Sequence, residues 1–322
     1  MKTLLCFGEV LIDFLQTGST NVDGIELPGF RQFPGGAPAN AAVAFARLGG
    51  EARFAGQVGD DPFGEFLASS LAHYGVDIRF LHKHPTASTA LAFVSLDSEG
   101  DRSFSFYRDG TADLLFTVDQ VDDDWFAGAP IFHACSNTLT SADIAAVTMH
   151  ALKRATDAGC IVSFDVNLRP RLWENGEVDR SACDAAVRSA DFVKFAKEEF
   201  EFLANGNTGR YVDSLLAGSA RLIVVTDGGN PAEFFTRQVR GTVSIPTVDV
   251  VDTTAAGDAF TAAVLRGLCA ASNIDLVVED AQCVESLLKF AVQCGSLAAT
   301  RRGAFPALPT FVEVEAFWTD MP

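Results

Sequence analysis

The segment 252–260 combines small residues with one carboxylate in a pattern that could support phosphoryl transfer. An extended, β-branched run at 245–251 precedes it, and an Ala-rich run with helical spacing follows at 259–270. We therefore expect a strand, a loop and a helix N-terminus, where unpaired backbone N–H groups bind phosphate. Asp258, in the first turn, could accept the proton of a hydroxyl group that attacks phosphorus. The same carboxylate could instead serve only to stabilise the helix N-terminus.

A second segment whose residues could bind a ligand is GGAPANAA at 35–42, which leads into an Ala-rich helical run. Paired glycines let a ligand approach the backbone, and the amide of Asn40 can bond two hydroxyl groups. Taken alone, this motif is more typical of a Gly-rich turn with Asn in the first turn of a helix.

These segments need a scaffold, and strand-like and helix-like runs alternate along the whole chain. This alternation predicts an α/β fold whose central, mostly parallel sheet carries helices on both faces. Such sheets bind ligands at the C-terminal ends of their strands, and Asp165, Thr226 and Asp258 are expected at or just beyond such ends. The expected strands are 3–7, 52–58, 130–134, 161–165, 192–195 and 222–226, and the expected helices are 39–48, 64–74, 142–158, 182–189 and 197–204.

Two segments interrupt this alternation. Short extended pieces at 11–33 surround a turn region rich in Gly, Asn and Asp, and 89–108 has the alternation of a hairpin with a turn at 97–100. We expect a small β-sheet lid that covers the strand ends of a single domain, 1–322, and expels water. The alternative is a peripheral insertion used only for dimer contacts, and both roles can hold.

Composition narrows the class of protein. The formal charge of −18 argues against a nucleic-acid or anionic-membrane surface, and 48% hydrophobic residues suffice for a large core. Seven cysteines without C-x-x-C spacing are typical of reduced thiols in the cytoplasm. Glu9 and Asp13 interrupt a start that resembles a signal peptide, and no window has the length of a membrane span.

Several ordered motifs together resemble the ribokinase-like sugar kinases, the PfkB family, from Gly8 to about Gly303. The block GQVGDDPFG at 56–64 resembles G-x-V-G-x-D-x-x-G, and DTTAAGD at 252–258 resembles D-T-x-G-A-G-D. Within the family, the stretches 35–49, 106–113 and 164–173 are most similar to fructokinases. Because 2-keto-3-deoxygluconate kinases share parts of these blocks, they remain the alternative, together with other ketose kinases.

The resemblance implies an ATP-dependent kinase that phosphorylates a sugar primary hydroxyl. Asp258 would be the general base, and backbone N–H groups of Ala255, Ala256 and Gly257 would stabilise charge on the phosphoryl oxygens. Arg108 could pair with Asp109 or Asp113 instead of contacting the sugar. Asn167 and Arg169 could, with Asp165, organise the triphosphate and Mg²⁺. The sugar-binding residues that the resemblance implies are Asp13, Gly35, Gly36, Asn40, Arg108, Asn167 and Arg169.

The resemblance also implies residues for the nucleotide and for cations. Thr226 and Gly228 would meet the ATP phosphates, and Gly303 would lie beside adenine. Glu199 would act on Mg²⁺ through water, although a solvated carboxylate on a helix face is an equal alternative. Asp252 and Thr254 stand where relatives coordinate a monovalent cation such as K⁺.

Two residues depart from the family pattern: Ala255 replaces the first glycine of the signature, and Ala196 replaces the Asn of N-x-x-E. A methyl group at Ala255 is compatible with an anion hole only if φ is negative there, which we expect. These departures favour the competing hypothesis of a sugar-binding regulator without transferase activity. A dinucleotide oxidoreductase is disfavoured because no G-x-G-x-x-G follows the first strand. The expected partners are a sugar, Mg-ATP and a second copy of the chain that pairs through the lid.

Overall fold

The main sheet is mostly parallel, as predicted, and has an antiparallel edge that was not predicted. The computed structural model describes residues 2–96, 102–128, 130–271 and 273–319. In this part of the chain the sheet order is β13-β12-β11-β10-β9-β8-β1-β4-β5. The strands from β5 to β11 in this order pair parallel, whereas β12 pairs antiparallel with both β11 and β13. The strands are β1 (Leu4–Phe7), β4 (Ala52–Gly59), β5 (Asp77–His84), β8 (Ile131–Cys135), β9 (Ile161–Asp165), β10 (Phe192–Ala196), β11 (Leu222–Asp227), β12 (Asn230–Phe235) and β13 (Arg240–Val243).

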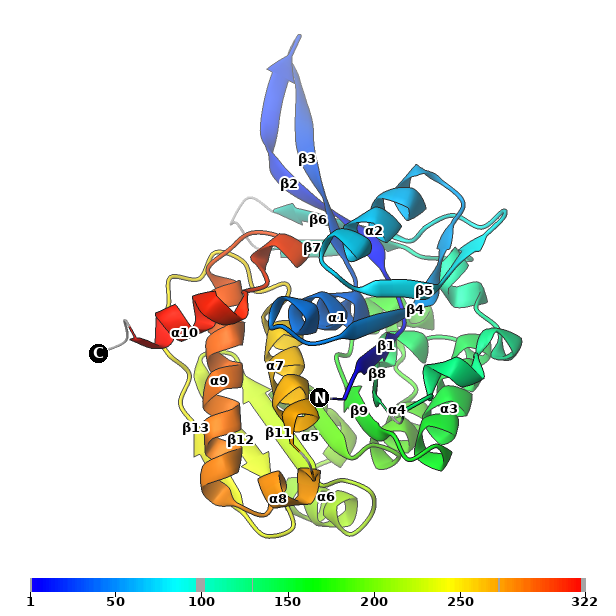
Figure 1. The fold of residues 1–322 in the computed structure, drawn as a ribbon. Coiled ribbons are helices and arrows are strands. Elements are labelled where there is room, and N and C mark those ends of the chain that lie inside the picture. Colours follow the sequence, from blue (N-terminus) through cyan, green and yellow to red (C-terminus); the bar gives the residue numbers. More distant parts are fainter. Residues whose placement is uncertain (1, 97–101, 129, 272, 320–322) are drawn as a thin grey trace.

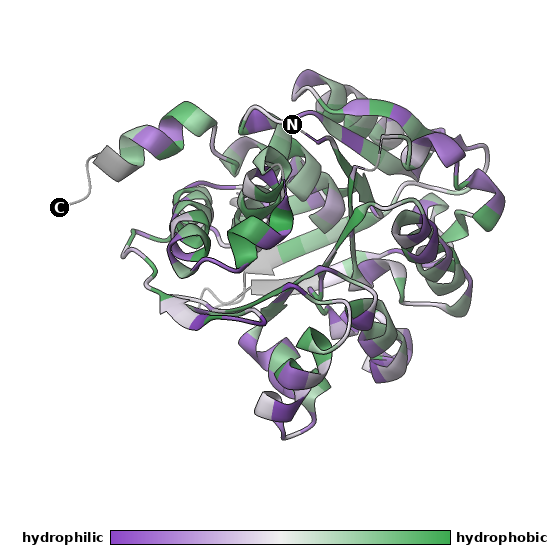
Figure 2. Cartoon of the chain, turned by 60° about the horizontal axis from the view of Figure 1, so that its bottom comes forward, coloured by the Kyte–Doolittle hydropathy of each residue, from purple (hydrophilic) through white to green (hydrophobic). Residues whose placement is uncertain are grey.

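Helices cover both faces of this sheet, as Figures 1 and 2 show. Because both faces are buried, the central strands are nearly continuous apolar runs, and two hydrophobic cores lie on opposite sides. The first core contains α1 (Ala37–Arg47), α2 (Pro62–His73), α7 (Ala256–Ala270), α8 (Ile274–Val278), α9 (Ala281–Ala299) and α10 (Phe311–Thr319). The second contains α3 (Ala142–Asp157), α4 (Arg180–Arg188), α5 (Lys197–Ala204) and α6 (Thr208–Leu216).

Short 3₁₀ helices join several of these elements. They lie at Ala112–Leu115, Val118–Gln120, Asp123–Trp125, Ser136–Thr138, Pro170–Leu172, Glu174–Gly176 and Phe305–Ala307. Across the described ranges, none of the helices has the length and apolar character needed to span a bilayer.

A second sheet has the order β3-β2-β6-β7 and confirms the small sheet expected from 11–33 and 89–108. Its strands are β2 (Leu11–Val22), β3 (Ile25–Gly35), β6 (Leu91–Leu96) and β7 (Arg102–Tyr107). The prediction of short pieces at 11–33 was wrong, because β2 and β3 have 12 and 11 residues and form an arm that leaves the body (Figure 1). Asp23 and Gly24, both with positive φ, close this arm. The turn expected at 97–100 lies outside the described residues.

The predicted strand at 245–251 was also wrong, because this segment is irregular. The backbone N–H groups of Val251 and Asp252 donate to the carbonyl of Ala299, at the end of α9, with distances of 2.8 and 3.0 Å. Val251 therefore finds its backbone partner at a helix end instead of in a sheet. Asp258 consequently follows a loop and not a strand, whereas Asp165 and Thr226 do lie at strand ends.

Candidate active site

The N-terminus of α7 separates two pockets that lie at the C-terminal ends of the parallel strands. The lid pocket, of about 390 Å³, is bounded by Asp258 and by residues of the small sheet. The loop pocket, of about 400 Å³, is bounded by Ala256, Gly257 and the 245–250 segment. Asp258 lines the lid pocket and Gly257 lines the loop pocket, so the first turn of α7 can contact two ligands at once.

The side chain of Asp258 is buried and fixed in direction. Its Oδ2 accepts a hydrogen bond of 2.7 Å from the amide of Asn40 on α1. Burial raises the pKa of Asp258 to about 7, although the hydrogen bond from Asn40 and the charges of Lys194 and Arg169 oppose that rise. A carboxylate that titrates near neutral pH suits proton abstraction from a hydroxyl group.

The backbone before Asp258 leaves amide groups available for an anion. Ala255 has φ −111, so the expectation of a negative φ is confirmed and the methyl group causes no backbone strain. The N–H of Ala256 donates to the carbonyl of Thr253 at 3.2 Å, so one of the three predicted amides already has a partner. Within the described residues, no backbone carbonyl accepts from the amides of Ala255 or Gly257. The positive end of α7 therefore offers at least two donors.

The paired glycines at 35 and 36 make room for the floor of the lid pocket. A Cβ atom on Gly35 would lie 2.0 Å from Oδ2 of Asp13. Gly36 has φ +104, and a Cβ atom there would lie 2.5 Å from the carbonyl oxygen of Glu9. Gly35 is thus required by the side chain of Asp13, and Gly36 by both backbone conformation and close approach. Of the residues predicted to bind sugar, the lid pocket is lined by Asp13, Gly36, Asn40, Asn167 and Arg169.

Three carboxylates border the lid pocket: Glu9, Asp13 and Asp258. Burial raises the pKa of Asp13 to about 7, and the charges of Asp252 and Glu9 add to that rise. Burial likewise raises the pKa of Glu9, against the attraction of Arg108. A cavity of this kind presents many hydrogen-bond acceptors, which suits a ligand rich in hydroxyl groups.

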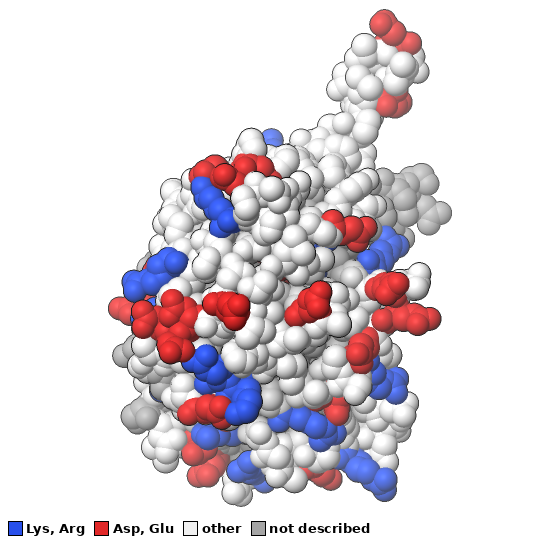
Figure 3. All heavy atoms as spheres, turned by 90° about the vertical axis from the view of Figure 1, so that its right-hand side faces the viewer, with Lys and Arg blue, Asp and Glu red and all other residues white. Residues whose placement is uncertain are grey.

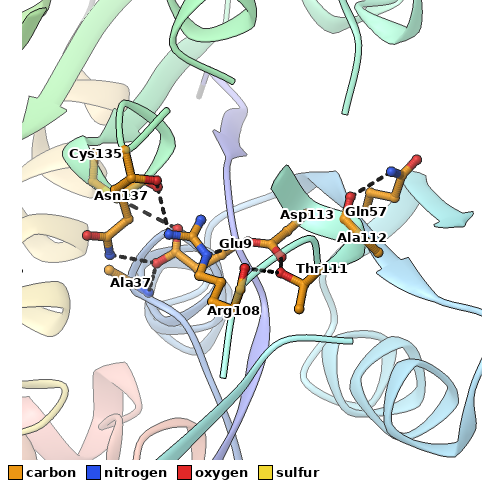
Figure 4. A network of polar contacts seen from close by, with 10 residues as sticks. Glu9, Ala37, Gln57, Arg108, Thr111, Ala112, Asp113, Cys135 and Asn137 are labelled. Carbon is orange, nitrogen blue, oxygen red and sulfur yellow. Dashed lines mark hydrogen bonds and ion pairs between the residues drawn. The ribbon is translucent and has the colours of Figure 1, made fainter. Parts of the chain in front are cut away.

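Arg108 lies behind the pocket and does not line it. Its Nε donates to Oδ2 of Asp113 at 2.6 Å, and its Nη1 donates to the carbonyl of Asn137 at 2.8 Å (Figure 4). The alternative that Arg108 pairs with Asp113 is therefore confirmed. Glu9, in the same network, accepts from the N–H of Ala37 at 3.0 Å and from the amide of Asn137 at 2.9 Å. The network thus holds the entry to α1 against the end of β8.

Sequence reasoning did not assign seven of the residues that line the lid pocket, which are Glu9, Leu11, Ala37, Phe106, Asn137, Leu172 and Thr253. The amide oxygens of Asn40 and Asn137 are buried and have no hydrogen-bond partner among the described residues, so they can accept from ligand hydroxyl groups. Glu9 and Asn137 each follow a predicted strand by two or three residues. The rule that ligands bind at such strand ends could therefore have identified both.

The loop pocket contains Thr226 and Gly228, as predicted for a nucleotide site. Its remaining walls are mainly apolar, and many of their residues come from the 245–250 segment and from α9. Apolar walls of this kind suit a flat aromatic ring. Gly303 does not line this pocket: its N–H donates to Oδ2 of Asp252 at 3.0 Å, and Phe33 fills the space where a Cβ atom would lie. The α9 residues that sequence reasoning missed are Val292, Gly295, Ser296 and Ala299.

The residues proposed for cations already have protein partners. Oδ1 of Asp252 accepts from both the N–H and the hydroxyl of Thr254, at 2.9 and 2.5 Å. Glu199 accepts from the N–H groups of Leu168 and Ala196 at 2.7 Å each, so it is buried and the solvated alternative was wrong. In the described part of the chain, no three His, Cys, Asp or Glu side chains are grouped as a metal site. These residues could therefore contact a cation only through water or through remaining lone pairs.

Known proteins are similar to this chain over nearly its whole length. The probable fructokinase-3 of Arabidopsis thaliana is 40% identical over 319 residues, which are 98% of this chain and 91% of that protein. The structure of the fructokinase of Xylella fastidiosa with bound ATP has a TM-score of 0.92 and 45% identity, covering 99% of this chain and 98% of that one.

A double mutant of the fructokinase of Vibrio cholerae O395, whose structure contains fructose, ADP and potassium ion, has a TM-score of 0.86 and 32% identity. This match covers 98% of each chain. The model of the pfkB family carbohydrate kinases matches residues 1–310. The chain therefore belongs to the pfkB family of carbohydrate kinases.

Proposed function

We propose that this protein is an ATP-dependent fructokinase with Asp258 as its general base. The observation that carries the proposal is the place of Asp258 and Gly257 on one helical turn, each facing a different pocket. The names of the relatives at about 40% identity support fructose as the sugar. ATP would occupy the loop pocket, and the sugar would occupy the lid pocket.

The transfer then needs only a few groups of the chain. Oδ1 of Asp258 takes the proton of the sugar's primary hydroxyl as that oxygen forms a bond to the γ-phosphorus, and the bond from phosphorus to the bridging oxygen of ADP breaks. Asn40 holds Oδ2 of the base, so the other oxygen remains for the sugar. The amides of Ala255 and Gly257 stabilise the charge on the phosphoryl oxygens. Lid residues such as Phe106 exclude water from the reacting atoms.

A neutral sugar fits the lid pocket better than a sugar acid. Glu9, Asp13 and Asp258 surround it with acceptors, and an additional carboxylate on the ligand would be repelled. Arg169 is the cationic side chain of the lining, but it is exposed and its Nη1 donates to the carbonyl of Leu168. This arrangement supports fructose over 2-keto-3-deoxygluconate.

The proposal includes Mg²⁺ bound mainly by the ATP phosphates, with Glu199 acting through water. It also includes a monovalent cation, K⁺, beside Asp252 and Thr254, supported by the potassium ion in the Vibrio cholerae structure. Mg²⁺ would neutralise phosphate charge during transfer. Titration of activity with Mg²⁺, and replacement of K⁺ by tetramethylammonium, test these two assignments.

Release of ADP, measured with a panel of sugars, tests the function. Fructose should give the highest kcat/KM, and 2-keto-3-deoxygluconate a much lower value. Higher kcat/KM for the sugar acid would contradict fructose as the substrate but not the kinase chemistry. Binding of every sugar without ADP release would contradict the kinase and support the sugar-binding regulator.

We also propose that two copies pair through the small sheet in a cytoplasmic homodimer. The arm stands clear of the body in Figure 3, and Val22, Ile25 and Leu27 near its tip are 46%, 63% and 48% exposed. A second copy would cover these aliphatic side chains and the strand edges. Sedimentation should give twice the monomer mass for the natural chain and the monomer mass for Ile25→Ser/Leu27→Ser. The seven free cysteines favour the cytoplasm.

A further inference from the structure

A buried ion pair lies directly beneath the first turn of α7. Lys194, in the centre of β10, donates from Nζ to Oδ1 of Asp165 at 3.1 Å. Their side chains are 7% and 4% exposed, so both charges are removed from water. The other oxygen of Asp165 accepts from the hydroxyl of Thr261, one turn after Asp258, at 3.1 Å. Asp165 therefore joins β9, β10 and α7.

The ammonium group of Lys194 also reaches the backbone of the anion hole. A Cβ atom on Gly257 would lie 3.3 Å from Nζ, so the ammonium lies against the peptide that carries one of the open amides. A cation at the positive end of a helix is unfavourable for the helix itself. Burial of both charges adds a desolvation cost that an apolar pair of similar volume would avoid. This costly arrangement becomes favourable when an anion binds at the helix end.

We propose that Lys194 and Asp165 form a positioning pair for phosphoryl transfer. Lys194 places positive charge behind the Gly257 amide, and Asp165 holds that charge and, through Thr261, the helical turn that carries Asp258. The inference rests on the proposed kinase function. Turnover by the natural chain tests that function first, and the variants below test only the pair.

The pair also acts on the base, because several elements present charges to Asp258. The charge of Asp165 raises the pKa of Asp258, whereas the charges of Lys194 and of Arg169, in the loop after β9, lower it. Asn40 on α1 opposes its protonation by a hydrogen bond. The buried thiols of Cys6 on β1 and Cys135 on β8 also lie within electrostatic range of this carboxylate. Neutralising one member of the pair therefore shifts the acid limb, which is the fall of kcat/KM at low pH. The direction of the shift depends on which member is neutralised.

The test uses Lys194→Gln, Asp165→Asn and the double variant, because both replacements remove a charge and keep a hydrogen-bonding side chain, although glutamine is one atom shorter than lysine. Ser163→Ala, on the same strand as Asp165, controls for a polar deletion in the buried sheet. For each folded variant we measure kcat, both KM values and the pH dependence of kcat/KM. Lys194→Gln should lower kcat about 10- to 100-fold with little change in the KM for fructose.

The pH profiles separate a positioning role from a structural one. The acid limb should move up by about one pH unit in Lys194→Gln, down in Asp165→Asn, and return near the natural value in the double variant. A limb that stays in place in both single variants would overturn the proposal, as would natural kcat in Lys194→Gln. If Lys194→Gln does not fold, Asp165→Asn decides alone: a downward shift supports the pair, and an unchanged limb overturns it.

Discussion

The amide of Asn40 and the carboxylate of Asp258, 218 positions apart in the sequence, meet in a hydrogen bond of 2.7 Å. This bond joins the first turns of α1 and α7, so two helix N-termini face the same pocket. One contributes a Gly-rich turn, and the other contributes the carboxylate and the amides that we propose as the base and the anion hole. The proposed catalytic arrangement is thus built at the contact of two helices.

Activity should fall on the acid side of neutral pH. Because burial raises the pKa of Asp258 to about 7, the base is increasingly protonated below that pH and kcat/KM should decline. A pH profile of kcat/KM for fructose between pH 5 and 9 measures this limb. Asp13 titrates in the same range, so Asp13→Asn serves as the control and should keep the limb. A flat profile down to pH 5 in the natural enzyme would exclude Asp258 as an essential base of this pKa.

The fold should lose stability as the pH rises from about 4 to about 7, because folding raises the pKa of Asp13. The pKa of Asp13 rises from 3.8 to about 7 on folding, so its stabilising contribution is complete below pH 4 and is lost as the pH rises through 7. Asp13→Asn removes this loss. The free energy of unfolding of the variant, relative to the natural chain, should therefore increase between pH 4 and 8 by up to about 4 kcal/mol. Denaturant titrations at several pH values measure this difference in the free energy of unfolding. A difference that does not change with pH argues against a buried Asp13 carboxyl group with a raised pKa.

Gly35→Ala should weaken sugar binding and leave ATP binding nearly unchanged. The new Cβ atom would lie 2.0 Å from Oδ2 of Asp13, so this carboxylate must move out of the pocket floor. We expect the KM for fructose to rise about 10- to 100-fold and the KM for ATP to change less than about twofold. Gly209→Ala on α6 is the matched control, since nothing lies within 4 Å of its Cβ atom. Equal effects of both substitutions on the KM for fructose would contradict the role of Gly35.

Ala255→Gly should leave turnover nearly unchanged although it restores the family residue. The backbone at Ala255 has φ −111, which alanine adopts without strain, so glycine adds only flexibility. We expect kcat within about threefold of the natural value and a free energy of unfolding lower by at most about 1 kcal/mol. A tenfold gain in kcat would mean that the methyl group obstructs the anion hole.

The layers of the fold could be predicted because each central strand is an apolar run between helical runs. The predicted 52–58 and 222–226 differ from β4 and β11 by one residue at one end. Prediction failed at 245–251, where β-branched residues suggested a strand but the carbonyl of Ala299 supplies the partner for two N–H groups. Such a contact depends on tertiary packing, which local propensity does not contain.

The position of Asp258 at a pocket was easier to predict than the walls of the pockets. Asp258 stands in a motif with a chemical purpose, but Gly295 and Ser296 on α9 are small residues with no chemical signal. Lys194 did carry a signal, because a lysine in an otherwise apolar strand must find a buried partner. The partner itself, Asp165, could be named only from the pairing of β9 with β10.

Turnover of Asp258→Asn, measured together with its affinity for fructose, shows whether Asp258 takes the proton of the sugar hydroxyl. Asparagine keeps the size of the side chain and can still bond Asn40, but it cannot accept the proton. If Asp258 is the general base, kcat should fall about 10²- to 10⁴-fold while the dissociation constant for fructose changes little. Near-natural kcat in a variant that binds fructose normally would contradict Asp258 as the general base.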